Sequence, residues 1–323
     1  MKLDEKSLRI GAIALLGAVL IRLCIPFLPQ DMHMASLLFF LESGYWAEPS
    51  EPGQEELPSA QAPEVLPDAV AVFAPQQAEE IRFHNPAGHT FSAEALLLRE
   101  LNWNLRGDRP KVLILHTHTT ESYENKEGYE ALPNYRTLDP SYNMLAVGDR
   151  LAEKLEQAGI GVIHDRTIHD YPSYNGAYTS SKASIKAYLE EYPDICLVLD
   201  LHRDAYEDSS GKQLGYTTTY EEEKVAQLML VVSAFDANEK DPKWQENMAL
   251  ALKLQAKLQL YCPGVARPIA VRTTNYNQAL GPRTLLVEMG AAGNTQQEAL
   301  GATDLLAQSI IDMALGAKSK DLV

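Results

Sequence analysis

Two short apolar runs constrain the fold of this chain more than any other feature. Residues 112–115 have the sequence VLIL, and residues 195–199 have the sequence ICLVL. A parallel strand that is buried on both faces has this continuous apolar character. A polar cluster follows each run, HTHTTE at 116–121 and DLHRD at 200–204. Ligands bind at the carboxyl ends of strands in open α/β sheets, so the two clusters predict one shared site.

The rest of the chain alternates between strand and helix patterns. The patterns predict strands at 162–164, 268–272 and 284–288 and helices at 141–158, 180–191, 244–260 and 296–315. This order favours an α/β fold with a mostly parallel sheet and helices on both faces. Asp139 and Pro140 are expected to be the N-cap and first residue of the helix at 141–158.

Composition and charge exclude some classes of function. The chain has 323 residues, of which 46% are hydrophobic, enough for one large domain with appendages. Its formal net charge of -16 argues against nucleic-acid binding, because phosphates would be repelled. Cys24, Cys196 and Cys262 form no CxxC pair, so no cysteine metal site is expected. A single Cys196–Cys262 bridge is an alternative, but buried free thiols are favoured.

The N-terminal segment predicts a membrane anchor at residues 10–30. This stretch is largely apolar, basic residues precede it within 1–9, and no Lys or Arg occurs between Arg22 and Arg82. That asymmetry predicts a cytoplasmic N-terminus and an extracytoplasmic remainder, with a single-pass cell-membrane location. A cleaved signal peptide is the alternative, but no small-x-small cleavage site follows the apolar stretch.

An extended stalk is predicted at residues 31–80, followed by one catalytic domain at 81–323. From Ala47 onward the stalk is dominated by Pro, Glu, Ala and Gln. Such a composition buries too little apolar surface to fold, so we expect the stalk to be disordered and to hold the domain away from the bilayer.

His118, Glu121 and His202 are the candidate metal ligands. Together they supply two imidazole nitrogens and one carboxylate oxygen, which leaves a fourth position for water, as a hydrolytic zinc ion requires. Glu288 follows the apolar residues 285–287. A carboxyl group among apolar neighbours has a raised pKa. Glu288 is therefore the candidate catalytic acid and base, able to take a proton from activated water and pass it to a leaving amine.

His116 and Arg203 are predicted to contact substrate. His116 stands two residues before His118, so it alternatively shares the metal or orients a ligand. Arg203 can bind a substrate carboxylate in a bidentate manner, and its alternative is a buried pair with Asp204.

Other assignments also have alternatives. Asp139 is the rival of Glu121 as the oxygen ligand, although it also suits an N-cap. Glu288 alternatively forms a structural ion pair with Arg203 or Arg283. The loop at 170–176, with sequence DYPSYNG, either lines a groove for a sugar or peptide or packs on itself.

Several strings resemble a known family. HTHTTESY, HDYPSYNGAY, VLDLHRDA, NYNQAL and LLVEMGAAGNTQQEA resemble the stage II sporulation protein P family of endospore-forming bacteria, from about Ile81 to the end of the chain. More loosely, the chain is similar to zinc-dependent N-acetylmuramoyl-L-alanine amidases, which have a three-layer αβα fold. By position, His118, His202 and Glu288 match two zinc ligands and the catalytic acid. The amidase pattern would place the carboxylate ligand at Asp139, whereas the family's HTHxxE string favours Glu121.

The resemblance implies a peptidoglycan hydrolase on the outer face of the membrane. It implies cleavage of the amide between N-acetylmuramic acid and L-alanine, an endopeptidase activity on cross-links, and Zn²⁺ as the cofactor. It also implies work during engulfment in sporulation, together with sporulation proteins D and M. The alternatives are a metallocarboxypeptidase of wall peptides and a non-catalytic wall scaffold.

Overall fold

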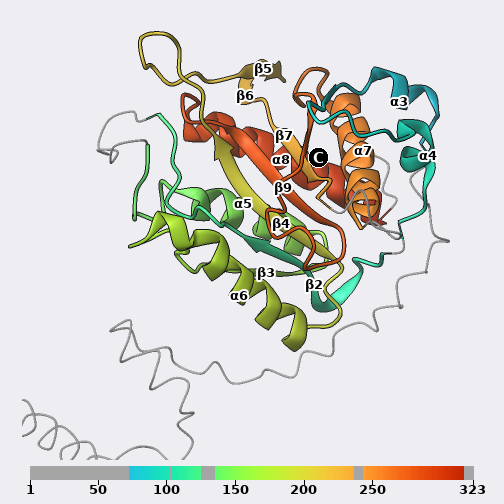
Figure 1. The fold of residues 1–323 in the computed structure, drawn as a ribbon, viewed down its shortest axis with the longest axis horizontal. Helices are drawn as coiled ribbons and strands as arrows, with labels where there is room; N and C mark the ends of the chain where they lie inside the picture. The colour runs from blue at the N-terminus through green and yellow to red at the C-terminus, as the bar shows by residue number, and fades with distance from the viewer. Residues whose placement is uncertain (1–72, 102, 125–134, 236–242, 316–323) are drawn as a thin grey trace, which may run out of the picture. The chain divides into compact units, whose positions relative to one another are not determined.

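A seven-stranded sheet forms the centre of the part of the chain that the structure describes, residues 73–101, 103–124, 135–235 and 243–315 of a computed structural model (Figure 1). Its strands are β1 (Phe83–His84), β2 (Gly107–Leu115), β3 (Ile160–His164), β4 (Leu197–Asp204), β7 (Met229–Ser233), β8 (Ile269–Arg272) and β9 (Thr284–Ala291). In space they follow the order β1-β8-β7-β9-β4-β2-β3. Every neighbouring pair is parallel except β7 and β9. The mostly parallel sheet is therefore confirmed, with one antiparallel junction between two parallel blocks.

Helices and a small hairpin complete the described residues. The α-helices are α3 (Gln76–Glu80), α4 (Ala93–Leu98), α5 (Met144–Gln157), α6 (Ala177–Glu191), α7 (Trp244–Tyr261) and α8 (Gln296–Leu315), and the hairpin strands are β5 (Thr217–Tyr220) and β6 (Glu223–Ala226). The predicted range of the last helix agrees with α8. Figure 1 shows the hairpin set apart from the main sheet.

The sequence predicts that this helix begins at Ser141, but α5 begins at Met144. Asn143 is its N-cap, because the Asn143 side chain accepts a hydrogen bond from the backbone N–H of Leu145 at 2.9 Å. The carboxylate of Asp139 instead accepts from the backbone N–H of Ser141, at 2.9 Å, in the turn before the helix. The prediction of Asp139 as the N-cap is therefore wrong, because the chain makes a further turn before the helix starts.

The main hydrophobic core joins one face of the sheet to α5, α7 and α8. Leu199 of β4, Leu230 of β7 and Val287 of β9 have no exposed surface in this core. Burying a side chain of this size contributes roughly 1.5–3 kcal/mol, so this layer dominates the stability of the sheet.

The opposite face is covered differently on its two halves. Over β2 and β4, Ile185 of α6 packs against Leu113, Leu115 and Val198. Over β9, β7 and β8 lies a separate apolar cluster, the apolar shelf, which consists of Met229, Val231, Ala270 and Leu286, with Tyr276 packed against it. The expected helices on both faces are therefore present, but on this second face α6 packs over only one half of the sheet.

The folded part of the chain includes residues that were predicted to belong to the stalk. Phe73 and Ala78 are buried in the main core, and the ammonium group of Lys253 on α7 lies 4.4 Å from the centre of the Phe73 ring. The predicted stalk, 31–80, is therefore too long at its end, because residues 73–80 pack on the domain.

The predicted membrane anchor at 10–30 and the stalk up to residue 72 lie outside the described residues. Within the described ranges, we find no helix with the length and apolar character needed to cross a bilayer. Cys196 and Cys262 are free thiols, as favoured from the sequence, but only Cys262 is buried and Cys196 is partly exposed.

Candidate functional site

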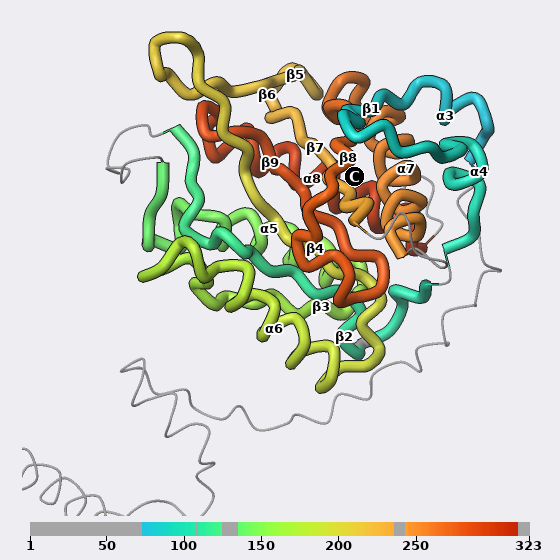
Figure 2. The backbone as a smooth tube through the Cα atoms, in the orientation of Figure 1, coloured from blue at the N-terminus to red at the C-terminus, as the bar shows by residue number. Residues whose placement is uncertain are grey.

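The four residues predicted to carry the chemistry come together at the centre of the sheet. His118 and Glu121 lie in the loop after β2, His202 lies on β4 and Glu288 lies on β9. Figure 2 shows β4 and β9 side by side, and His202 and Glu288 are register partners on these strands. The sequence suggested that both residues lie at or just past the ends of their strands, but the structure places them within β4 and β9. All four line one cleft of about 670 Å³.

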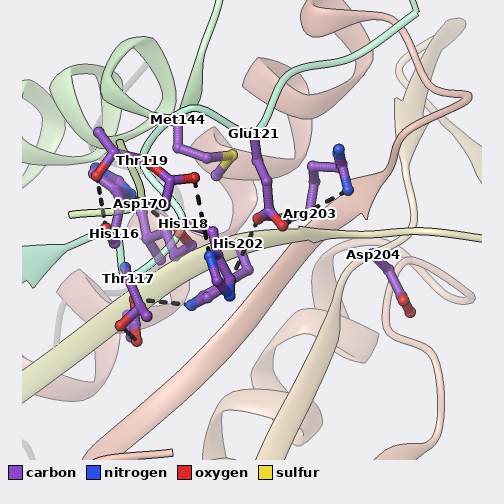
Figure 3. A network of polar contacts seen from close by, with 12 residues as sticks. His116, Thr117, His118, Thr119, Glu121, Met144, Asp170, His202, Arg203 and Asp204 are labelled. Atoms are coloured by element: carbon purple, nitrogen blue, oxygen red, sulfur yellow. Dashed lines mark hydrogen bonds and ion pairs between the residues drawn. The ribbon is translucent and has the colours of Figure 1, made fainter. Parts of the chain in front are cut away.

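His202 lies between two carboxylates. Its Nδ1 is 3.5 Å from Oε2 of Glu121 (Figure 3). Its Nε2 is 2.9 Å from Oδ1 of Asp200. The contact between His202 and Asp200 is short enough for an ion pair, but its angles do not meet those of a hydrogen bond. Thr117 fixes Asp200, with its backbone N–H donating at 2.7 Å and its hydroxyl at 2.6 Å. Burial lowers the pKa of His202, but the two acids outweigh it and raise the pKa well above 6.5.

Two arginines hold Glu121. A guanidinium nitrogen of Arg136 lies 3.2 Å from Oε1, and the backbone N–H of Arg203 donates to Oε2 at 3.2 Å. Burial acts to raise the pKa of Glu121, but His202 and Arg203 outweigh it and lower the pKa to about 2. Glu121 is therefore an ionised carboxylate at neutral pH.

Arg203 is directed into the protein. Its Nε donates to the carbonyl of Ser122 at 2.9 Å, and another guanidinium nitrogen donates to the carbonyl of Tyr135 at 3.0 Å. Asp204 points away from this cluster in Figure 3 and pairs with Arg267 at 3.1 Å. The alternative of a buried Arg203–Asp204 pair is therefore wrong. The predicted contact of Arg203 with substrate stays a prediction, while its visible role is to position Glu121 and the neighbouring loop.

His118 lies between an aromatic ring and an acid. Its imidazole stacks on Tyr174 with ring centres 4.4 Å apart, and its Nδ1 is 3.9 Å from Oδ2 of Asp170. That nitrogen is buried and has no hydrogen-bond partner among the described residues. Arg136 and Thr120 fix Asp170, through contacts of 2.6 and 2.7 Å to the same Oδ2. Tyr174 belongs to the loop at 170–176 and lines the cleft. This agrees with the interpretation that the loop lines a groove.

Glu288 does not form the structural ion pair with Arg203 or Arg283 that was the alternative to a catalytic role. Within the described ranges it lies in no salt bridge, and its buried Oε2 has no hydrogen-bond partner. Arg283, one expected partner, donates from Nε to the carbonyl of Cys196 at 2.8 Å instead. Burial raises the pKa of Glu288 to about 8. The carboxyl group therefore holds a proton at neutral pH and faces the cleft beside His202.

This raised pKa predicts how stability depends on pH in the full chain freed of metal by a chelator. Between pH 4.5 and about 8 the folded protein keeps the Glu288 proton while the unfolded chain loses it, so stability falls as pH rises. The slope from this group is at most about 1.4 kcal/mol per pH unit. The change in urea midpoint from pH 5 to pH 8 should therefore be more positive in Glu288→Gln than in the wild type. Equal differences would contradict the buried protonated carboxyl.

His116 takes a place that the sequence did not predict. It is fully buried, and its Nδ1 donates to the carbonyl of Leu201 at 3.1 Å. Its Nε2 is thereby left to accept from Nε2 of His164, 2.8 Å away. Strand alternation does not apply to His116 and His118, because β2 ends at Leu115. The predicted contact of His116 with substrate does not agree with this position, since a residue without exposed surface cannot touch a ligand.

Gly148 on α5 makes room for the two histidines. A Cβ atom at this position would lie 2.3 Å from Nε2 of His164 and 2.5 Å from Nε2 of His116. We expect Gly148→Ala to destabilise the fold by about 1–3 kcal/mol, the usual cost of overpacking a core. Gly176→Ala is the matched control, because its Cβ would meet only the Ser173 hydroxyl, at 3.7 Å. Thermal denaturation of both variants checks this, and equal melting temperatures would contradict it.

The oxygen and nitrogen donors of Glu121 and His202 suit a shared cation. Their separation of 3.5 Å is close to the roughly 3.3 Å expected between two ligands of a tetrahedral ion with bonds near 2.0 Å. Among the described side chains, no group of three or more His, Cys, Asp or Glu already has the spacing of a metal site. His118 matches the donor set by residue type, but its side chain is not already placed with those of Glu121 and His202 around one shared ion. Asp139, the rival ligand, is exposed and does not line the cleft.

Three charged residues of the site were not predicted. Asp200 had a signal, because it stands two residues before His202 on one strand and so points to the same side. Asp170 was singled out only as part of the loop at 170–176, and Arg136 had no signal, since both lie in irregular segments whose path the sequence pattern does not specify.

Comparison with solved structures finds N-acetylmuramoyl-L-alanine amidases. The enzyme of Nostoc punctiforme is 13% identical, with 65% of this chain and 98% of that chain covered and a TM-score of 0.40. The enzyme of Clostridium difficile 630 is 16% identical, with 65% and 97% covered and a TM-score of 0.40. These values are too low to establish a shared fold or activity.

Sequence comparison is more specific. The stage II sporulation protein P of Bacillus subtilis (strain 168) is 28% identical over 220 residues, which are 64% of this chain and 52% of that protein. The match thus spans about half the length of this curated relative. The family model of stage II sporulation protein P matches residues 48–311. This chain therefore belongs to the stage II sporulation protein P family.

Proposed function

We propose that this protein is a peptidoglycan hydrolase that uses Zn²⁺ to cleave the amide between N-acetylmuramic acid and L-alanine during sporulation. The observation that carries the proposal is a buried, protonated Glu288 in the same cleft as His118, Glu121 and His202. Membership of the sporulation family supports the biological setting.

Zn²⁺ would be held by Glu121 and His202 together with His118. Their donor types fit it, and Asp200 faces the second nitrogen of His202, as a carboxylate beside a metal-binding histidine commonly does. When bound, the ion supplies a Lewis acid that polarises the scissile carbonyl and acidifies water.

Glu288 would carry the proton transfer. Its carboxyl group lies in the cleft without a hydrogen-bond partner on Oε2, so it is free to bond to a reacting group. Deprotonated Glu288 would accept a proton from the attacking water and then pass that proton to the leaving amine, so one residue serves first as base and then as acid. A pKa of about 8 keeps the protonated form available for the second step at neutral pH.

The walls of the cleft suit a substrate with a sugar and a peptide. Tyr174 lines the cleft, with the His118 ring stacked on it and the Arg136 guanidinium 4.6 Å from its centre, and Tyr178 and Tyr276 line the cleft further along. A tyrosine offers an apolar ring with a polar hydroxyl, which suits a ligand that has both kinds of surface. On the expectations stated above, the substrate is wall material outside the cell membrane, an endopeptidase activity accompanies the amidase, and sporulation proteins D and M are the partners.

A metallocarboxypeptidase is less well supported. It needs an arginine beside the metal to bind a terminal carboxylate, and Arg203 and Arg283 were the candidates. Arg203 uses its guanidinium on internal carbonyls, and Arg283 bonds to the carbonyl of Cys196 and does not line the cleft.

Product analysis tests the proposal. The full chain, loaded with Zn²⁺, is incubated with purified peptidoglycan, with Glu288→Gln as the control. We expect released peptides with a free N-terminal alanine and glycan strands without peptide. Release of single C-terminal residues would indicate a carboxypeptidase. If neither peptides nor single residues are released, the protein is a non-catalytic wall scaffold.

A further inference from the structure

The apolar shelf, Met229, Val231, Ala270 and Leu286, connects Glu288 to a charged end of the same cleft. Glu288, Leu286, Val231 and Met229 line the cleft, and so does Arg272 at the end of β8. The side chains of alternate residues share one face of a strand, so Met229, Val231 and Ser233 point to the same side of β7. Arg272 lies opposite Ser233 and therefore stands on that face as well.

The register of the strands gives the length of the shelf. Met229 lies opposite Glu288, and Arg272 lies opposite Ser233. Met229 and Ser233 are four positions apart on β7, and β8 is two strands from β9. With about 3.3 Å per residue and about 4.8 Å between strands, the Cα atoms of Glu288 and Arg272 lie roughly 16 Å apart.

Arg272 differs from the other arginines of the cleft in its partners. Arg136 pairs with Glu121 and Asp170, and Arg203 pairs with Glu121. Arg272 forms no ion pair or side-chain hydrogen bond with any residue in the described ranges, although it is partly buried. A guanidinium has five donors in a planar fork that matches a carboxylate, so this one is available to an anionic ligand.

We propose that Arg272 binds a carboxylate of the peptide part of the substrate, while the apolar shelf carries the peptide between that carboxylate and the scissile bond at Glu288. This inference rests on the proposed function for the identity of the substrate. Peptides of the bacterial wall carry free carboxylates along their length, which matches a single cation at the end of an apolar surface. The sugar would then lie on the other side of Glu288, towards Tyr174.

The distance distinguishes this subsite from that of a carboxypeptidase. A terminal carboxylate is separated from its own peptide bond by one residue, about 3.5 Å of chain. An extended arginine side chain spans less than half of the separation between Arg272 and Glu288. The bound carboxylate therefore belongs to a residue further along the peptide than the one whose amide is cleaved.

The test uses the full chain with Zn²⁺ and two soluble substrates, a muramoyl peptide with free carboxylates beyond its first residue and the same compound with these groups converted to carboxamides. We expect the wild type to have about a tenfold lower KM for the carboxylate form, the effect of one charge-assisted bidentate contact. Arg272→Gln should lose this preference through a higher KM for the carboxylate form, and Arg272→Lys should keep part of it. Arg109→Gln is the matched control, since Arg109 is 81% exposed and pairs with Asp194.

A binding measurement separates this inference from the proposed function. Calorimetry with the same two compounds and Glu288→Gln, alone and combined with Arg272→Gln, gives affinities without turnover. If the wild type hydrolyses neither compound but Arg272→Gln still weakens binding of the carboxylate form, the subsite stands and the proposed reaction fails. If hydrolysis occurs and Arg272→Gln retains the full preference for carboxylate, the subsite is overturned and the reaction stands.

Discussion

Glu288→Gln should lower turnover of peptidoglycan by about 10²–10⁴-fold while the protein still binds zinc. Glutamine keeps the size of the side chain and its place on β9, but it can neither release nor accept the proton that a carboxyl group transfers. We expect a large effect because Oε2 has no hydrogen-bond partner among the described residues that could take over the proton transfer. Metal content and kcat, measured on the same full-length sample, separate loss of catalysis from loss of the ion.

Glu190→Gln is the matched control for this experiment. Glu190 lies on the exposed surface of α6 and does not line the cleft. The same change in charge there should leave kcat unaltered. If Glu288→Gln retained full activity, the proton transfer would have to belong to another acid of the cleft, and the proposed role of Glu288 would be rejected.

The sequence contained enough information to predict the centre of the fold. The apolar runs of β2 and β4 are buried on both faces, and this burial is the cause of their continuous apolar pattern. The antiparallel junction between β7 and β9 could not be predicted in the same way. Strand direction depends on the path of the connections and not on the pattern within a strand.

The predicted residues of the candidate site lie on a strand or follow one within a few residues, whereas the residues that were missed include two from irregular segments. His202 and Glu288 sit on neighbouring strands, so their meeting follows from the order of β4 and β9 in the sheet. Arg136 reaches Glu121 from a loop, and such a contact depends on tertiary packing alone. His116 was misplaced because β2 ends one residue before it, and the period of two fails outside a strand.

His202→Ala should weaken zinc binding by more than about 10²-fold and reduce hydrolysis to background. Removing only a hydrogen-bond partner of a ligand costs up to about 100-fold in metal affinity, and this substitution removes a ligand itself. The domain should remain folded, because Asp200 keeps its hydrogen bonds from Thr117 and Glu121 keeps its contact with Arg136.

The matched control for His202→Ala is His84→Ala, since His84 is exposed on β1 at the edge of the sheet. Circular dichroism checks the fold of both variants, and metal analysis after dialysis against limiting zinc gives their stoichiometry. The control should bind as much zinc as the wild type, because an exposed imidazole remote from Glu121 contributes no ligand there. A folded His202→Ala protein that still bound one zinc ion per chain would show that the ion is held elsewhere. The cluster of His118, Glu121 and His202 would then be a buried ion-pair network that supports the sheet.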